Sequence, residues 1–347
     1  MLDRSYRVEG VPLPLLMVGL AALCAYPLVL GRPSYQNIMI LTLLFGAMGT
    51  AWNILGGYAG QISLGHGVYF GIGAYTTAFF YTNYLLSPWL SLPLAFALAV
   101  LAAAVIGIPT FRLRGHYFVL ASVFIVDAIH IVISNTSALG AAIGIEYPLH
   151  RDDDLAGSLW AMQYHGSKLP YYYAALALFV VSFAISWRVQ NTALGYYLRA
   201  IRDDQDAAQS LGIDIAKYKL VALVISALLV TLCGTFYAQY VLYVEPTSTI
   251  SLAISVQIAF VAIFGGIGML WGPVLGAFVI IPATEFLRIY FSGAIAPKIG
   301  DESFSSMVTY YLSGGGGNVD LIAYGLLIMI VARFQPNGML GFFRKMR

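Results

Sequence analysis

Two ionisable side chains lie in the middle of an apolar stretch of the sequence, where a charge is expensive. Asp127 and His130 are three residues apart, so a helix over 117–137 would place both on one face. An aspartate inside a membrane-spanning helix costs about 2.5–3.5 kcal/mol on insertion, so a functional role is the default interpretation. The pair could relay protons or contact a substrate. Alternatively, the two side chains hydrogen-bond to each other inside a helix bundle.

A second group of polar side chains lies in a glycine-rich stretch, NILGGYAGQISLGHGVYFGIGAY at 53–75. A glycine inside a helix costs about 1 kcal/mol relative to alanine, so a plain lipid-facing helix would not accumulate them. The glycines allow either close helix packing or an unwound turn that lines a pathway. The sequence leaves both readings open. The candidates for a pathway or subunit interface are Gly60, Gln61, Ser63, Gly65, His66 and Gly71.

Charges of both signs are concentrated at 188–217, RVQNTALGYYLRAIRDDQDAAQSLGIDIAK. Between Gly195 and Leu211, apolar residues recur at helical spacing, which predicts a short amphipathic helix. Gly212 would end this helix as a C-terminal cap. Such a helix is either a solvated surface element or a docking element for another protein.

The composition of the chain indicates that the segments carrying these three groups of residues lie in a lipid membrane. The chain has 347 residues, of which 60% are hydrophobic and only 10% are charged, whereas soluble domains are about 25% charged. This composition excludes an ordinary cytosolic enzyme, a disordered regulator and a nucleic-acid binder. The two cysteines, Cys24 and Cys233, lie in apolar runs, and no metal-ligand spacing occurs, so no metal site is expected.

Ten apolar stretches are long enough, or nearly so, to cross a bilayer. They predict an all-α, polytopic transmembrane helix bundle that forms a single domain over 1–347. Three of the stretches are interrupted by glycine, and the last one is short. The stretches are 11–30, 36–56, 61–83, 89–109, 117–137, 170–187, 218–244, 251–267, 272–291 and 320–333.

The basic residues predict the orientation of this bundle. With the N-terminus inside and ten alternating segments, 13 of the 18 lysines and arginines face the cytoplasm, as basic residues tend to do. The loops at 138–169 and 292–319 are then outside. The loop at 188–217 and both chain ends are then cytoplasmic.

The cytoplasmic loop also carries a motif. The sequence Asp206-Ala207-Ala208-x-x-x-Gly212 is similar to the EAA-x-x-x-G sequence of ABC importer permeases, with Asp in place of Glu. In that family this loop forms a coupling helix that docks on a cytoplasmic ATPase. The resemblance implies coupling roles for Arg199, Arg202, Asp203, Asp206, Ala207, Ala208 and Gly212.

Further motifs extend the resemblance over nearly the whole chain. The chain resembles the M-type permease subunit of the branched-chain amino acid ABC importers, the high-affinity Leu/Ile/Val family. The motifs are GYAGQISLGHGVYFGIGAY at 57–75, FRLRGHYFVLAS at 111–122, ALGYYLRAIRDDQDAAQSLGID at 193–214, FGGIGMLWGPVLGAF at 264–278 and PNGMLGFFRK at 336–345.

The resemblance implies a transport subunit of a bacterial inner membrane rather than an enzyme. The sequence has no G-x-x-x-x-G-K-[ST] phosphate loop, so no cofactor is expected and ATP is used by partner subunits. The implied partners are a second homologous permease, two cytoplasmic ATPases and a periplasmic substrate-binding protein. The outer segment at 138–149 departs from the family pattern, which leaves urea or short amides as alternative substrates. A proton-coupled secondary transporter using Asp127 and His130 is the alternative of another class.

Overall fold

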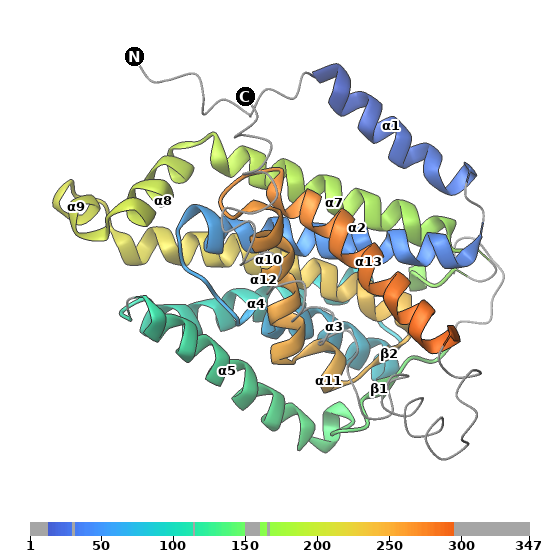
Figure 1. Cartoon of the computed structure of the whole chain (residues 1–347). Helices are drawn as coiled ribbons and strands as arrows, with labels where there is room; N and C mark the ends of the chain where they lie inside the picture. The colour runs from blue at the N-terminus through green and yellow to red at the C-terminus, as the bar shows by residue number, and fades with distance from the viewer. Residues whose placement is uncertain (1–12, 30–31, 114, 150–159, 165–166, 295–347) are drawn as a thin grey trace.

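The computed structural model describes residues 13–29, 32–113, 115–149, 160–164 and 167–294 (Figure 1). The predicted segment at 320–333, almost all of the predicted outer loop at 292–319, and both chain ends lie outside the described residues. So does the tail motif at 336–345.

The described chain is a helix bundle, which confirms the predicted fold class. Nine of the ten predicted membrane segments correspond to a helix of the described part. The bounds are α1 Leu13–Val29, α2 Pro33–Asn53, α3 His66–Tyr84, α4 Pro88–Thr110, α5 His116–Ser134, α7 Leu169–Gln190, α8 Ala193–Asp203, α9 Gln205–Ser210, α10 Ile215–Val241, α11 Pro246–Thr249, α12 Leu252–Gly266 and α13 Gly272–Ala294. A π-helical turn, η2, covers Ile54–Tyr58, a 3-10 turn, η3, covers Ser137–Leu139, and two short strands are β1 Ile145–Glu146 and β2 Tyr243–Val244.

Six of the helical stretches in the described part are long and apolar enough to cross a membrane. They are 33–58, 88–110, 116–134, 169–190, 215–241 and 246–266. Two shorter apolar stretches, at 18–29 and 272–286, lie in α1 and α13. The prediction of about ten spans is therefore approximate.

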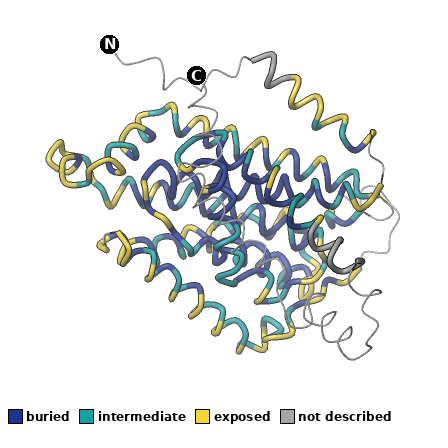
Figure 2. Tube along the Cα trace, viewed as in Figure 1, coloured by how far each residue is buried: buried dark blue, intermediate teal, exposed yellow. Residues whose placement is uncertain are grey.

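Helices α2 and α10 lie at the centre of the bundle (Figures 1 and 2). Helices α3 and α4 pack on α10, and α7, α12 and α13 pack on α2. Almost every residue from Ile40 to Ala59 is buried. Helices α1 and α5 lie at the periphery and are largely exposed (Figure 2). From Ile40 onward α2 is buried on almost all sides, and a helix buried in this way must have other helices around it.

The contact between α3 and α10 is built on a pair of glycines. A Cβ atom placed on Gly73 would lie 2.0 Å from Thr231 O, and one on Gly234 would lie 2.0 Å from Phe70 O. The backbones can approach this closely because neither residue has a side chain. Thr231 Oγ1 then donates a hydrogen bond across the contact to Tyr69 O, at 3.0 Å.

The bundle has two distinct ends. We call one the α8–α9 end, because α8 and α9 project from it (Figure 1). The buried turn η2 contacts α8 at this end. We call the other the β-ladder end, because β1 and β2 pair there as antiparallel strands, Ile145 opposite Val244 and Glu146 opposite Tyr243. The chain passes back and forth between these ends, as a polytopic bundle requires.

Candidate functional site

The predicted coupling helix is two helices rather than one. Helix α8 ends at Asp203 and α9 begins at Gln205, because Asp204 adopts an extended conformation with φ −155° and ψ 115°. The Asp204 carboxylate accepts hydrogen bonds from the backbone N–H groups of Asp206 and Ala207, at 2.9 and 3.0 Å. Aspartate is favoured as an N-cap for this reason. The single helix predicted from Gly195 to Leu211 is therefore corrected to a helix, a capped break and a second short helix.

Helix α9 ends in a fixed turn at Gly212, which has φ +83°. Gly212 N–H donates to Gln209 O at 2.9 Å and Ile213 N–H to Ala208 O at 3.1 Å. These two bonds form a Schellman motif, in which glycine occupies the left-handed position. Gly212 therefore ends the helix, as its position in the sequence predicted.

The exposed surface of this turn is formed by residues of the Asp206–Gly212 motif. Asp206 and Ala207 are exposed, and Leu211 is 81% exposed. Ala208, in contrast, is buried against the chain itself. A single helix with the apolar spacing predicted from Gly195 to Leu211 would place Leu211 on the same side as the buried Leu198. The observed exposure of Leu211 differs, because the extended residue Asp204 separates α8 from α9.

Helix α8 lies against the bundle through Leu198 and Ile201, which are both fully buried. Arg199 Nη1 donates to Gln190 O of α7 at 3.1 Å, and its guanidinium lies 4.7 Å from the centre of the Tyr196 ring. These contacts place α8 at the boundary between the projecting α9 and the transmembrane helices.

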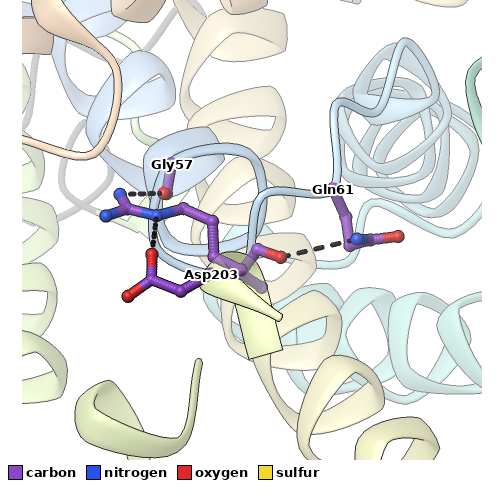
Figure 3. Close-up of polar contacts among 5 residues, drawn as sticks. Gly57, Gln61 and Asp203 are labelled. Carbon is purple, nitrogen blue, oxygen red and sulfur yellow. Dashed lines mark hydrogen bonds and ion pairs between the residues drawn. The ribbon is translucent and has the colours of Figure 1, made fainter. Parts of the chain in front are cut away.

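Arg202 connects α8 to the glycine-rich stretch. Its Nη1 donates to Gly57 O at 3.1 Å, and its Nε lies 3.6 Å from the Asp203 carboxylate (Figure 3). Gln61 lies on the following segment and donates to Ala59 O at 3.4 Å (Figure 3). The structure thus brings together predicted residues from both groups, the coupling loop and the glycine-rich stretch.

The glycine-rich stretch is unwound between η2 and α3. No helix or strand covers residues 59–65. Ser63 O accepts a hydrogen bond from Trp52 Nε1 at 2.7 Å, and Gly65 N–H bonds the Ser63 side chain at 3.2 Å. An unwound segment in a membrane protein is tolerated where other groups of the protein satisfy its backbone. The prediction of a broken segment is thus met at 59–65.

The polar residues of this stretch are nevertheless enclosed within one chain. Gln61 is 5% exposed, Ser63 is 4% exposed and His66 is fully buried. His66 Nε2 is hydrogen-bonded to Ser226 Oγ of α10, at 2.8 Å. In the described conformation these side chains are thus covered by other parts of the same chain. Their place along a pathway or at a subunit interface stays a prediction.

The glycines at the start of α3 make close contacts with the segment around α11 and α12. Gly67 N–H donates to Ser255 Oγ at 2.9 Å. A Cβ atom on Gly71 would lie 1.9 Å from Ile250 Cγ1. Close packing, one of the two readings of these glycines, is therefore what the structure displays at Gly67 and Gly71.

A small cavity lies beside the unwound segment. Its volume is about 10 Å³, which is room for about one water molecule. It lies between the unwound segment, α3, α4, α5 and α10, and its polar lining includes Ser63, Tyr69, Thr110 and Ser122. Ser122 Oγ also accepts a hydrogen bond from Leu64 N–H, at 3.0 Å. Helix α5 therefore closes the outer side of the unwound segment.

The structure separates the predicted intramembrane pair. His130 Nδ1 donates to the carbonyl oxygen of Ile250 at 2.8 Å, whereas Asp127 is exposed on the outer side of α5. The expected hydrogen bond between Asp127 and His130 inside the bundle is therefore wrong. The spacing correctly placed both residues on α5, but it did not show which face of the helix packs on the bundle.

Sequence reasoning missed Asn53 at the end of α2. The side chain is fully buried; its Oδ1 accepts from Gly268 N–H at 2.8 Å and its Nδ2 donates to Met269 O at 2.9 Å. A lone amide in an apolar segment, three residues before the pair Gly56-Gly57, was the available signal. Within the described residues, no three His, Cys, Asp or Glu side chains are grouped so that they could hold a metal ion.

Comparison with known proteins agrees with this architecture. The sequence profile described as "Branched-chain amino acid transport system / permease component" matches residues 34–331. The chain is 29% identical over 290 residues to the high-affinity branched-chain amino acid transport system permease protein LivM of Salmonella typhimurium, covering 79% of this chain and 68% of that protein. The protein of the same name from Escherichia coli is 29% identical over 292 residues, with the same two coverages.

A more distant relative comes from an archaeon. The probable branched-chain amino acid transport permease protein LivM of Methanocaldococcus jannaschii is 22% identical over 254 residues, covering 72% of this chain and 67% of that protein. No solved structure matches the chain at a significant level. Because the family profile covers most of the sequence, the chain belongs to the family of permease components of branched-chain amino acid transport systems.

Proposed function

We propose that this permease forms part of the route by which branched-chain amino acids cross the membrane in an ATP-driven importer. The names of its relatives and the motif at Asp206–Gly212 support the proposal. A second homologous permease, two ATPases and a periplasmic substrate-binding protein complete the transporter. The permease lies in the bacterial inner membrane. Its α8–α9 end and both chain termini face the cytoplasm, and its β-ladder end faces the periplasmic binding protein.

One observation carries the coupling part of this proposal. Helix α9 projects from the bundle (Figure 1) with Asp206, Ala207 and Leu211 exposed. The Asp204 cap and the Gly212 turn hold it in one conformation. A rigid projection with a small residue, an acid and a large apolar side chain suits docking into a groove of another protein. The residues most directly available to an ATPase are thus Asp206, Ala207 and Leu211, and Gly212 shapes the turn.

The docking surface is tested by the double substitution Asp206→Lys and Ala207→Trp. Reversed charge and added bulk at an interface cost several kcal/mol, so ATPase copurification should fall more than about tenfold. ATP-driven leucine uptake should fall with it. Both measurements are made on the complex purified with its ATPase subunits. Leu101→Ala, an exposed change in the middle of α4, serves as the control. Survival of both copurification and uptake in the double variant would show that α9 does not dock the ATPase.

The energy source separates this function from proton-coupled transport. His130 is bonded to a backbone carbonyl and Asp127 lies on the periphery, so the two do not form a relay in this structure. In proteoliposomes holding the complete complex, leucine uptake should require ATP and should be insensitive to a protonophore. Excess isoleucine or valine should compete with labelled leucine, whereas urea should not. Uptake that collapses with the proton gradient would contradict the proposal.

We further propose that the unwound segment is one wall of the route, with Gly60, Gln61, Ser63, Gly65, His66 and Gly71 along it. A cavity of about 10 Å³ holds about one water molecule and no amino acid. The route is therefore closed at this point in the described conformation. Helix α5 is the least embedded neighbour of the segment, so opening requires α5 to move away from it.

A further inference from the structure

We infer that Arg202 and Asn53 together form a clamp that ties the projecting helices to both glycine-rich turns of the bundle. The two turns are η2 with residues 59–60, and residues 267–271. The clamp makes α8 and the two turns move as one unit during transport. This inference rests on the proposed docking role of α9, and it assigns Arg202 a positioning role within the permease rather than a contact with the ATPase.

Arg202 lies where the two turns meet. Its Nη1 donates to Gly57 O at 3.1 Å. A Cβ atom on Gly60 would lie 2.6 Å from Arg202 Cγ, and one on Gly268 would lie 2.5 Å from Arg202 Nη1. The arginine side chain therefore occupies the space that side chains at Gly60 and Gly268 would fill.

Asn53 joins the same two turns from inside the bundle. Its amide oxygen accepts from Gly268 N–H at 2.8 Å, and its amide nitrogen donates to Met269 O at 2.9 Å. A Cβ atom on Gly57 would lie 1.9 Å from Asn53 Oδ1, so Gly57 leaves room for this contact. Gly57 is also the residue whose carbonyl Arg202 binds. The two polar side chains thus meet at one glycine pair, Gly57 and Gly268.

The chemistry of these contacts suits transmission of movement. The contact of α8 with the bundle through Leu198 and Ile201 is apolar, and apolar contact has no preferred direction. A planar guanidinium and an amide that bonds through both of its polar atoms fix direction as well as distance. A displacement of α9 along the membrane normal therefore reaches α2 and the α12–α13 turn through Arg202 and Asn53.

The test uses the complete transporter in proteoliposomes with its binding protein and labelled leucine. The variants are Arg202→Gln, Arg202→Lys and Asn53→Ala. Arg188→Gln is the matched control, because Arg188 is an exposed arginine in the last turn of the neighbouring helix α7. Three quantities are measured for each: copurification of the ATPases, ATP hydrolysis, and leucine transported per ATP hydrolysed.

We expect Arg202→Gln and Asn53→Ala to keep the ATPases bound and ATP hydrolysis within about twofold, while transport per ATP falls about tenfold. Arg202→Lys should recover part of this loss, because an ammonium can still donate to Gly57 O. The control should keep the wild-type ratio. Because Asn53 is buried, the Asn53→Ala protein could fail to assemble. In that case the Arg202 variants test the clamp, since the Arg202 side chain is 38% exposed and its replacement is less disruptive to folding.

Two results would overturn the clamp. The first is transport per ATP within twofold of wild type in Arg202→Gln. The second is loss of the ATPases in Arg202→Gln, which would assign Arg202 to the docking surface. Failure of the docking proposal is seen separately, as ATPases that stay bound to the Asp206→Lys, Ala207→Trp variant.

Discussion

Leucine in place of Gly73 or Gly234 is expected to abolish the folded permease. In each case the first atom of the new side chain falls 2.0 Å from a backbone carbonyl oxygen of the facing helix, Thr231 O or Phe70 O. Backbone atoms cannot move aside as a flexible side chain can, so α3 and α10 would have to separate. The hydrogen bonds of Thr231 to Tyr69 O and of Thr235 to Gly73 O would then be lost, and those groups would remain buried.

The cost of each substitution is expected to exceed about 3 kcal/mol, the upper part of the usual range for overpacking. The measurement is the yield of monodisperse protein in detergent together with its Tm. Gly19→Leu is the matched control, because a Cβ atom there has no neighbour within 4 Å. A Gly73→Leu protein with wild-type yield and Tm would show that the two helices do not pack as described.

A disulfide between α5 and the unwound segment is expected to stop transport. A Cβ atom on Gly65 would lie 3.7 Å from Ser122 Cβ, which is close to the separation of about 3.8 Å in disulfides. The double variant Gly65→Cys, Ser122→Cys should therefore cross-link on mild oxidation. If α5 must leave the segment to open the route, uptake should fall about tenfold or more and should return on reduction.

This experiment is made in a background with Cys24→Ser and Cys233→Ala, and peptide mass spectrometry measures the extent of cross-linking. The single cysteine variants, treated with the same oxidant, are the controls. ATPase copurification should not change, because the new bond involves no residue of the projecting helix α9. Full uptake by a completely cross-linked protein would mean that α5 and the unwound segment stay together during transport.

The positions of the helices could be predicted from the sequence because they depend on local composition. A stretch such as 89–109 is apolar over the length of a bilayer, and α4 covers Pro88–Thr110. The helix end at Gly212 could also be predicted, because glycine is the residue favoured at a left-handed C-terminal cap. The break at Asp204 could not be predicted, because the same sequence pattern is compatible with an aspartate inside one helix and with an aspartate that caps a second helix.

The arrangement of the candidate site could not be predicted, because it depends on contacts between distant parts of the chain. Asn53 bonds to residues 215 and 216 positions away. The spacing of Asp127 and His130 specified a shared helix but not the face that packs on the bundle. Likewise, Gln61 and His66 are polar residues in a broken segment, and only the positions of α8 and α10 show that they are enclosed.

The β-ladder end has a consequence for how this family can vary. Strands β1 and β2 are held together by main-chain groups, and Glu146 and Tyr243 point outward from the ladder while Ile145 and Val244 point inward. Main-chain hydrogen bonds do not depend on the identity of the outward side chains. Substitutions of the outward residues Glu146 and Tyr243 can therefore leave the pairing of β1 and β2 intact. The α8–α9 end is built differently, because Arg202 occupies the space that side chains at Gly60 and Gly268 would fill, so these three positions cannot change independently.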